Sequence, residues 1–282
     1  MSIEVKGLNF FYNKGQVFEK KALDDINMFI ADGEFVGIIG HTGSGKSTLI
    51  QHFNALLTPD SGAVYLNGND INADKTKHAE IRRKIGLVFQ YPEHQLFEIS
   101  VYKDVAFGLQ FLNLPPQDVD RRVRGALKVV GLSEDYFEKS PFELSGGEKR
   151  RAAIAGVLAM EPEILILDEP TAGLDPKGRD EILEQIKILG EELKITVVLV
   201  SHSMEDVARL VDKVFVMADS KIVLHGSVGE VFANSELLES IGLAAPQITY
   251  LMKELSQRGF SAKGGVYTVN DAFRAIKDVL DE

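Results

Sequence analysis

Residues 40–47 read Gly-His-Thr-Gly-Ser-Gly-Lys-Ser and separate two apolar segments of different kinds. Residues 35–39 are nearly all apolar, as in a strand buried on both faces, whereas residues 48–57 have the spacing of a helix. In a strand–loop–helix unit of this kind, the glycines let backbone N–H groups turn toward phosphate oxygens at the positive end of the helix. The motif therefore constrains the chain to an α/β fold and predicts a phosphate-binding loop.

The positions of this loop have separate predicted tasks. Lys46 supplies a positive charge for terminal phosphates, and the Ser47 hydroxyl is placed to coordinate Mg²⁺. His41 lies within the loop at a position that the motif leaves open. The residues that we expect to bind the nucleotide phosphates are Gly40, His41, Thr42, Gly43, Ser44, Gly45, Lys46, Ser47 and Thr48.

Composition narrows the class of protein around this loop. The chain has 282 residues, a net charge of −11 and no cysteine. This length suffices for one large domain, or for a domain with an appendage. The acidic balance argues against a nucleic-acid surface and against a polybasic lipid-binding patch. The lack of cysteine fits the cytosol. Because neither a signal peptide nor a membrane span is predicted, a role in transport would need another subunit to form the pore.

Apolar runs predict the core of the fold. A strand over 164–167, a helix over 178–193 and a strand over 196–200 form a crossover, which requires parallel pairing. Alternation over 3–12 predicts an edge strand of a separate antiparallel sheet. The other predicted strands are 26–30, 35–39, 63–66, 85–89, 214–217, 221–225 and a short one near 266–269, and the other predicted helices are 104–111, 118–130, 247–258 and 271–280.

Two acidic residues, Asp168 and Glu169, directly follow the apolar strand at 164–167. Because side chains alternate along a strand, the two carboxylates point in different directions. Asp168 can face a Mg²⁺ ion while Glu169 faces the water that attacks the γ-phosphate. Acids are common at solvated strand ends, but beside a phosphate loop the pair predicts a hydrolytic site.

A second glycine-rich segment, Leu144-Ser145-Gly146-Gly147-Glu148, precedes a predicted helix. Ser145 can cap that helix, and the two glycines allow a ligand to approach the backbone closely. Taken alone, this segment is an ordinary capped turn, so its meaning depends on the order of the surrounding motifs.

That order resembles the nucleotide-binding subunits of ABC transporters. The phosphate loop is followed by Gln90, by the signature segment 144–148, by the strand with its two acids, by Ala172-Gly173-Leu174-Asp175 and by His202. The resemblance covers residues 1 to about 230. It implies an ABC-type P-loop NTPase with a parallel core sheet, an antiparallel β subdomain, a helical subdomain at about 92–155 and a small C-terminal α/β appendage, residues 231–282, that serves dimerisation. It also implies ATP and Mg²⁺ as ligands, bound in a head-to-tail dimer with a second ABC ATPase, either a copy or a paralogue.

The resemblance assigns roles position by position. Tyr12 matches the aromatic residue that stacks on adenine. Gln90 matches the glutamine that senses Mg²⁺ and the attacking water, and His202 matches the histidine that holds Glu169, water and γ-phosphate. Asp175 matches the residue that couples the two sites across the dimer. The implied catalytic residues are Glu169, His202 and Gln90, the implied metal-binding residues are Ser47, Gln90 and Asp168, and the implied contacts to the nucleotide of the other subunit are Ser145, Gly146, Gly147 and Asp175.

One position departs from the family pattern. The signature usually ends in glutamine, and Glu148 stands there in this chain. Two interpretations stay open at this point: the carboxylate lies near the nucleotide of the partner, or it caps its own helix.

Further stretches resemble the ATPases of energy-coupling factor (ECF) transporters and their cobalt-importing relatives. These stretches are residues 91–98, 149–159, 170–178 and 242–246. The resemblance implies an ATPase that is peripheral to the cytoplasmic side of the cell membrane. Its implied partners are a transmembrane coupling protein and a membrane subunit that captures a vitamin or another micronutrient. The segment 92–155 would receive coupling helices. Its apolar residues Leu96, Phe97, Val101 and Phe107 either face such a helix or form the subdomain core, and the core is favoured for Phe107.

Other functions remain as alternatives. Within transport, the alternative is an ATPase of a cobalt or nickel importer, or of a conventional importer with a soluble binding protein. In another class, a soluble ABC ATPase would act on nucleic acid or on ribosomes. That class is disfavoured by the acidic charge, by the single ATPase unit and by the lack of heptads in the interval of about 100 residues between the phosphate loop and the signature. A phosphate-loop kinase would need neither the signature nor His202.

Overall fold

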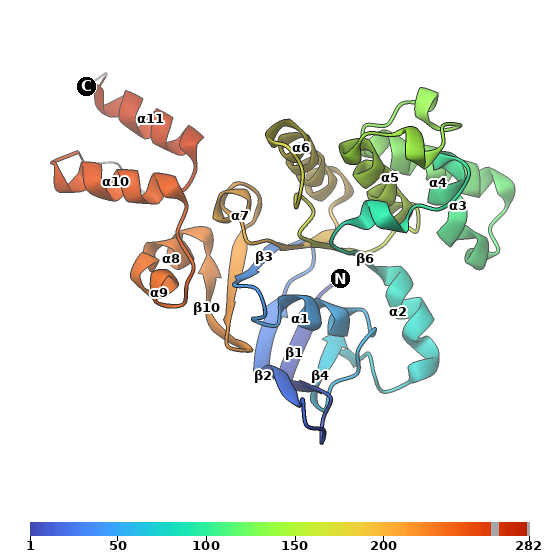
Figure 1. The fold of residues 1–282 in the computed structure, drawn as a ribbon, viewed down its shortest axis with the longest axis horizontal. Coiled ribbons are helices and arrows are strands. Elements are labelled where there is room, and N and C mark those ends of the chain that lie inside the picture. Colours follow the sequence, from blue (N-terminus) through green and yellow to red (C-terminus); the bar gives the residue numbers. More distant parts are fainter. Residues whose placement is uncertain (261–264, 281–282) are drawn as a thin grey trace.

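The computed structural model describes residues 1–260 and 265–280, apart from the side chains of 191–193. It contains two sheets and a surrounding set of helices (Figure 1). The strands are β1 (Ile3–Tyr12), β2 (Lys20–Ile30), β3 (Phe35–Gly40), β4 (Ser61–Leu66), β5 (Asn69–Asp70), β6 (Ile85–Val88), β7 (Ile164–Asp168), β8 (Thr196–Val200), β9 (Lys213–Ala218) and β10 (Lys221–Ser227). The α-helices are α1 (Lys46–Phe53), α2 (His78–Lys84), α3 (Val101–Ala106), α4 (Pro116–Val129), α5 (Gly146–Leu158), α6 (Pro176–Leu193), α7 (Met204–Leu210), α8 (Val228–Ala233), α9 (Ser235–Ser240), α10 (Gln247–Gln257) and α11 (Val269–Leu280).

The larger sheet has the strand order β10-β9-β3-β8-β7-β6, and every pairing in it is parallel except that of β10 with β9. The packing of strand β7 explains why its first four residues, 164–167, are all apolar. Ile164 and Ile166 point into one core cluster, whereas Leu165 and Leu167 point into the other. Both faces of the sheet are therefore covered, as the continuous apolar runs predict. The parallel pairing of β7 with β8 across α6 is likewise confirmed.

The smaller sheet is antiparallel and has the order β2-β1-β4-β5. Residues 3–12 are predicted as an edge strand, and that prediction is wrong: β1 pairs with β2 on one side and with β4 on the other. Alternation shows which face of a strand is buried, but it does not count the neighbours of the strand. Helix α1 packs between this sheet and the larger one through Leu49, Ile50 and Phe53, which are fully buried.

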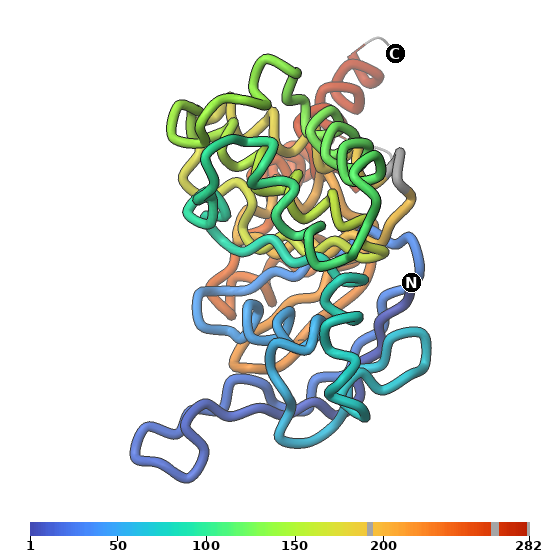
Figure 2. Tube along the Cα trace, turned by 90° about the vertical axis from the view of Figure 1, so that its right-hand side faces the viewer, coloured from blue at the N-terminus to red at the C-terminus, as the bar shows by residue number. Residues whose placement is uncertain are grey.

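The helices α3, α4 and α5 gather at the opposite end of the molecule from the antiparallel sheet (Figures 1 and 2). The predicted helix 104–111 differs from the observed one. Ser100 caps α3, which begins at Val101, and the chain tightens into a 3₁₀ helix over Phe107–Leu112. Val101 is buried in the core, so of its two predicted places the structure supports the subdomain core and not the partner-facing surface. Phe97 is 59% exposed, and its ring lies edge-on to that of Phe107.

The C-terminal part begins with α8 and α9 and ends with α10 and α11, which lie side by side (Figure 1). A strand near 266–269 and an α/β appendage are predicted here, but residues 265–268 form no strand, and this part is helical where the structure describes it. Tyr267 instead donates a hydrogen bond from its hydroxyl to the Gly229 carbonyl (3.1 Å). Residues 261–264 and 281–282 of the predicted appendage lie outside the described residues. Across the described chain, none of the helices combines the length and the apolarity that a membrane span requires.

Candidate nucleotide site

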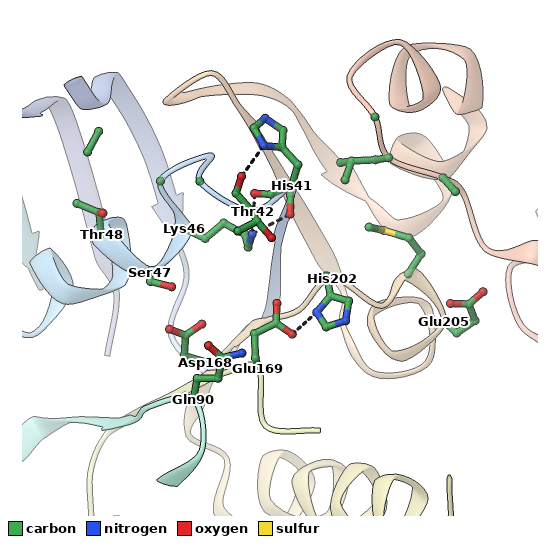
Figure 3. Close-up of a pocket in the computed structure, with 18 of the residues that line it drawn as sticks. His41, Thr42, Lys46, Ser47, Thr48, Gln90, Asp168, Glu169, His202 and Glu205 are labelled. Carbon is green, nitrogen blue, oxygen red and sulfur yellow. Dashed lines mark hydrogen bonds and ion pairs between the residues drawn. The ribbon is translucent and has the colours of Figure 1, made fainter. Parts of the chain in front are cut away.

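A cavity of about 770 Å³ lies where the loop after β3 meets the ends of β7 and β8. Figure 3 shows Lys46 at the start of α1, Asp168 and Glu169 at the end of β7 and His202 after β8 around this cavity. The predicted site residues that line the cavity are Tyr12, Gly40, His41, Thr42, Gly43, Gly45, Lys46, Ser47, Thr48, Gln90, Asp168, Glu169 and His202. Segments that are far apart in the sequence therefore meet at the edge of the parallel sheet where α/β proteins commonly bind ligands.

The loop after β3 leads into α1 without a side-chain cap. Gly45 occupies the N-cap position with φ 106°, and no side chain there accepts a hydrogen bond from the first turn of the helix. A Cβ at Gly45 would approach the Ala22 carbonyl oxygen to 2.5 Å, and one at Gly40 would approach the Met217 carbonyl oxygen to 2.3 Å. The first amides of a helix have no intrahelical acceptor. The N-terminus of α1 is therefore suited to bind an anion.

Lys46 is 8% exposed, and its Nζ donates to the carbonyl oxygens of Gly40 (2.7 Å) and His41 (3.1 Å). Burial lowers the pKa of this ammonium group, although Glu169 and Asp168 nearby favour its charged form. Ser44, which is fully buried, has a hydroxyl without a hydrogen-bond partner among the described residues. The loop thus holds a buried cation that lines the cavity and suits phosphate oxygens, whereas the predicted site residue Ser44 does not line the cavity.

The two acids differ in environment, as their alternation predicts. Asp168 is buried, and burial raises the pKa of its carboxyl group, while a hydrogen bond with Ser47 opposes this rise. Glu169 leaves the strand with φ 50°, and its amide donates to the Val200 carbonyl (2.9 Å). Nδ1 of His202 lies 2.6 Å from Oε2 of Glu169. One carboxylate therefore faces the phosphate loop, and the other faces the histidine.

The side chains present fit Mg²⁺ as it is bound in phosphate sites. Among the side chains that the structure describes, which exclude those of 191–193, no cluster of three His, Cys, Asp or Glu residues is suited to a metal. Ser47, Gln90 and Asp168 offer a hydroxyl, an amide and a single carboxylate at one wall of the cavity. Mg²⁺ commonly takes one or two protein oxygens together with water and substrate phosphates. A set with few protein ligands is therefore appropriate for this ion.

Tyr12, at the end of β1, also lines the cavity. Its ring contacts Phe10 edge-on, with the centroids 5.0 Å apart, and its hydroxyl lies 3.1 Å from Oγ1 of Thr48. The ring is 40% exposed, so one face is free to stack on a planar ligand.

The signature residues Ser145, Gly146 and Gly147 are not among the residues that line this cavity, and neither is Asp175. Each serine or acid in this set caps a helix of its own. Asp175 accepts a hydrogen bond from the Gly178 amide (2.8 Å) at the start of α6. Ser145 and Glu148 form a reciprocal capping box on α5.

The capping box supports the second interpretation of Glu148, in which the carboxylate caps its own helix. One carboxylate oxygen accepts from the Ser145 amide (2.8 Å), and the other accepts from the Tyr136 hydroxyl (2.8 Å). Both oxygens are engaged within the chain, so the residue caps its own helix.

One wall of the cavity was not predicted from the sequence. It consists of Met204 and Glu205 in α7, of residues 242–245 and of Gln247 at the start of α10. The Gln247 amide donates to Oε1 of Glu205 (3.3 Å). The only sequence signal was the Gly-Leu-Ala-Ala-Pro stretch at 242–246, because nothing in local spacing shows where a distant turn will pack. Lys20 and Ala22 of β2 complete the lining.

Comparison with known proteins agrees with this geometry. A family model described as ABC transporter matches residues 23–172. The energy-coupling factor transporter ATP-binding protein EcfA2 of Clostridium tetani is 55% identical over 282 residues, which cover 100% of this chain and 98% of that protein.

Two solved structures share the fold. The structure of cbiO1 from Clostridium perfringens, described as part of the ABC transporter complex cbiONQ, has a TM-score of 0.77 and 43% identity over 89% of this chain and 98% of that one. The ATP-binding cassette MJ0796, a dimer bound to ADP and Pi, has a TM-score of 0.72 and 32% identity over 80% of this chain and 98% of that one. This chain therefore belongs to the ABC transporter ATPases, among the ATP-binding subunits of energy-coupling factor transporters.

Proposed function

We propose that this chain binds ATP with Mg²⁺ in the cavity and that Glu169 polarises the water that attacks the γ-phosphate. The observation that carries the proposal is the 2.6 Å contact between His202 and Glu169, at the same cavity as Lys46 and Asp168. Mg²⁺ neutralises phosphate charge and orients the reacting oxygens. Ser47, Gln90 and Asp168 would hold it. His202 keeps the Glu169 carboxylate directed at the water.

A second ABC ATPase would complete the site in a head-to-tail dimer. Support comes from the signature segment 144–148 and from Asp175, which present exposed, self-capped helix starts away from the cavity of their own chain. The related cassette MJ0796 is a dimer. In this arrangement Ser145, Gly146, Gly147 and Asp175 contact the nucleotide that the other subunit binds.

ATP hydrolysis by this pair would drive the uptake of a vitamin or another micronutrient through membrane partners. The names of the relatives, an ECF transporter protein and a member of the cbiONQ complex, support this assignment. The chain would act at the cytoplasmic side of the cell membrane, bound to a transmembrane coupling protein, while a separate membrane subunit captures the substrate. Residues 1–230 would form the ATPase domain, with a helical subdomain at about 92–155. Residues 231–282 would form a dimerisation appendage.

The test of the catalytic assignment is Glu169→Gln, which keeps the size of the side chain and removes its basicity. We expect turnover of the assembled ATPase to fall by about 10²- to 10⁴-fold, because a general base contributes that much. ATP should stay trapped in a closed dimer, which size-exclusion chromatography would detect. The control is Glu163→Gln, an exposed acid just before the same strand. Retained turnover in Glu169→Gln would refute the role of the base.

The test of the transport assignment is purification of the tagged chain from detergent-solubilised membranes of its own host, with partners identified by mass spectrometry. Recovery of a second ATPase, a polytopic coupling protein and small integral membrane subunits is the expected result. A conventional permease with a soluble binding protein would favour the other importer class. Soluble partners alone would end the transport proposal.

A further inference from the structure

The buried side chain of Arg150 connects helix α5 with the turn at residues 92–95 and with the loop 170–172, which follows the proposed catalytic acid. Arg150 lies in α5, and its side chain is 1% exposed. Its guanidinium makes a two-pronged contact with Glu93: Nε donates to Oε2 (3.1 Å) and Nη2 donates to Oε1 (2.7 Å). Glu93 lies three residues after Gln90, in a 3₁₀ turn over Pro92–Gln95. Paired bonds of this kind fix both the distance and the plane of the guanidinium.

The third guanidinium nitrogen of Arg150, Nη1, contacts the loop that follows Glu169. Nη1 donates to the carbonyl oxygens of Pro170 (2.9 Å) and Ala172 (2.7 Å). The Ala172 amide in turn donates to the Glu169 carbonyl (3.1 Å), which closes a tight turn on the acid itself. The position of this turn therefore depends directly on the position of the guanidinium.

Helix α7, which follows His202, also holds this turn. The Thr171 hydroxyl donates to Oδ2 of Asp206 (3.2 Å), a buried acid in α7. Arg179 pairs with Asp206 as well, through Nε (3.0 Å). The loop 170–172 is thus braced between Arg150 and α7. Because Glu169 has a left-handed backbone (φ 50°), the direction of its side chain relies on this bracing.

Glu93 is the counterion of the buried Arg150 side chain. The two backbone carbonyls that Arg150 contacts are neutral, so Glu93 supplies the negative charge within contact distance of the buried guanidinium. A buried charge that loses its counterion draws in water or moves toward solvent. Loss of the Glu93 carboxylate would therefore release Arg150 from the loop 170–172.

We propose that Glu93 and Arg150 are positioning residues for ATP hydrolysis, which hold the loop 170–172 and through it the Glu169 carboxylate. The pair ties the segment after Gln90 and the signature helix α5 to the catalytic acid, so that a displacement of the helical segment moves the acid. The inference rests on the proposed role of Glu169. Neither residue lines the cavity, so neither contributes to ATP affinity.

The test measures steady-state hydrolysis by Glu93→Gln and Arg150→Lys in the full chain, assembled with its partner subunits. Both variants should lower kcat by about tenfold to a hundredfold, because small misplacement of a catalytic group has effects of this size. KM and the affinity for a fluorescent ATP analogue should change less than about twofold. Lysine keeps the charge but cannot hold Glu93 and two carbonyls at once, so a pair that contributes only charge would be rescued by it. The control is Arg124→Gln, which breaks exposed ion pairs with Asp120 and Glu134 in the same helical region.

Hydrogen exchange of the peptide that covers residues 169–175 is the second readout. Faster exchange in Glu93→Gln, but not in Arg124→Gln, is the expected result. A pair that only fastens the helical segment would lower the unfolding temperature and leave kcat and this peptide unchanged, which would overturn the proposal. Glu169→Gln is measured in parallel. If Glu169→Gln keeps its turnover, the catalytic assignment fails. If it loses turnover while Glu93→Gln and Arg150→Lys do not, the positioning role alone fails.

Discussion

The helices α1 and α5 both begin within glycine-rich segments, yet only α5 has a side-chain cap at its N-terminus. At α1, Gly45 leaves the first turn without any side-chain cap. At α5, the Ser145 hydroxyl accepts from the Glu148 amide (3.4 Å), and the Glu148 carboxylate accepts from the Ser145 amide (2.8 Å). The amides of an uncapped first turn are free to bind a ligand. In a capped first turn, a side chain of the protein already accepts a hydrogen bond from an amide. This difference agrees with the proposed function, in which α1 holds phosphates within the chain and α5 faces another subunit.

The N-termini of α1 and α5 also differ in their charged residues. The first turn of α1 has no acidic residue, and the nearby cation is Lys46, whose pKa is lowered by burial. The first turn of α5 carries Glu148, whose pKa is lowered by the hydrogen bond from the Ser145 amide. A carboxylate at a helix N-terminus neutralises the helix dipole. At α5 an acidic residue of the first turn supplies this anion, whereas the first turn of α1 contains no acidic residue.

The strongest test of this contrast is Lys46→Ala. We expect the Kd for ATP to rise by about a hundredfold, because a charge-assisted hydrogen bond to phosphate is lost. The unfolding temperature should not fall, since burial of the ammonium group is itself unfavourable. Titration with a fluorescent ATP analogue measures the affinity, with Lys84→Ala on α2 as the control for a lost surface cation. Unchanged affinity would sink the assignment of the loop.

A smaller effect is expected for Ser145→Ala at the other helix. The capping bond is lost, which should lower the free energy of unfolding by about 1 kcal/mol. Turnover of the assembled pair should fall by about tenfold, because in the proposed dimer the hydroxyl is lost from the surface that faces the nucleotide of the other subunit. Affinity of the isolated chain should not change, since Ser145 lies outside its cavity.

The control for this variant is Ser227→Ala, which removes the equivalent cap from α8. It should lose comparable stability and keep its turnover. If Ser145→Ala weakened ATP binding by the isolated chain as much as Lys46→Ala does, the division of labour between the two helices would be wrong.

The contrast also marks what the sequence could and could not predict. The phosphate loop, the strand that ends at Asp168 and the strand before His202 were predicted within about one residue, because glycine positions and continuous apolar runs are local signals. The neighbours of β1 were not predictable in this way, since pairing with β4 depends on residues more than fifty positions away. The purpose of Glu148 became clear only when Tyr136 and Ser145 were seen around it. Arg150 is one of three successive basic residues in the sequence, and only packing distinguishes it from its neighbours.

The smallest expected effect belongs to Glu148→Gln, and it probes the anion that α5 supplies for itself. Because the pKa of Glu148 is lowered in the folded chain, its ionised form adds stability above the pKa of the unfolded chain, near 4.3, and this stability is lost as the pH falls through the lowered value. Glutamine preserves the capping box but carries no charge. We therefore expect a loss of about 0.3 kcal/mol at pH 7 after screening by solvent, measured by urea unfolding. The difference from the parent chain should vanish in acid, and turnover should stay within about twofold because the signature backbone is unchanged.

Glu230→Gln, in the matching box on α8, should show a pH dependence of the same sign. A large gain or loss of turnover in Glu148→Gln alone would mean that this carboxylate acts on the nucleotide of the other subunit, and the two helix starts would then differ less than their caps indicate.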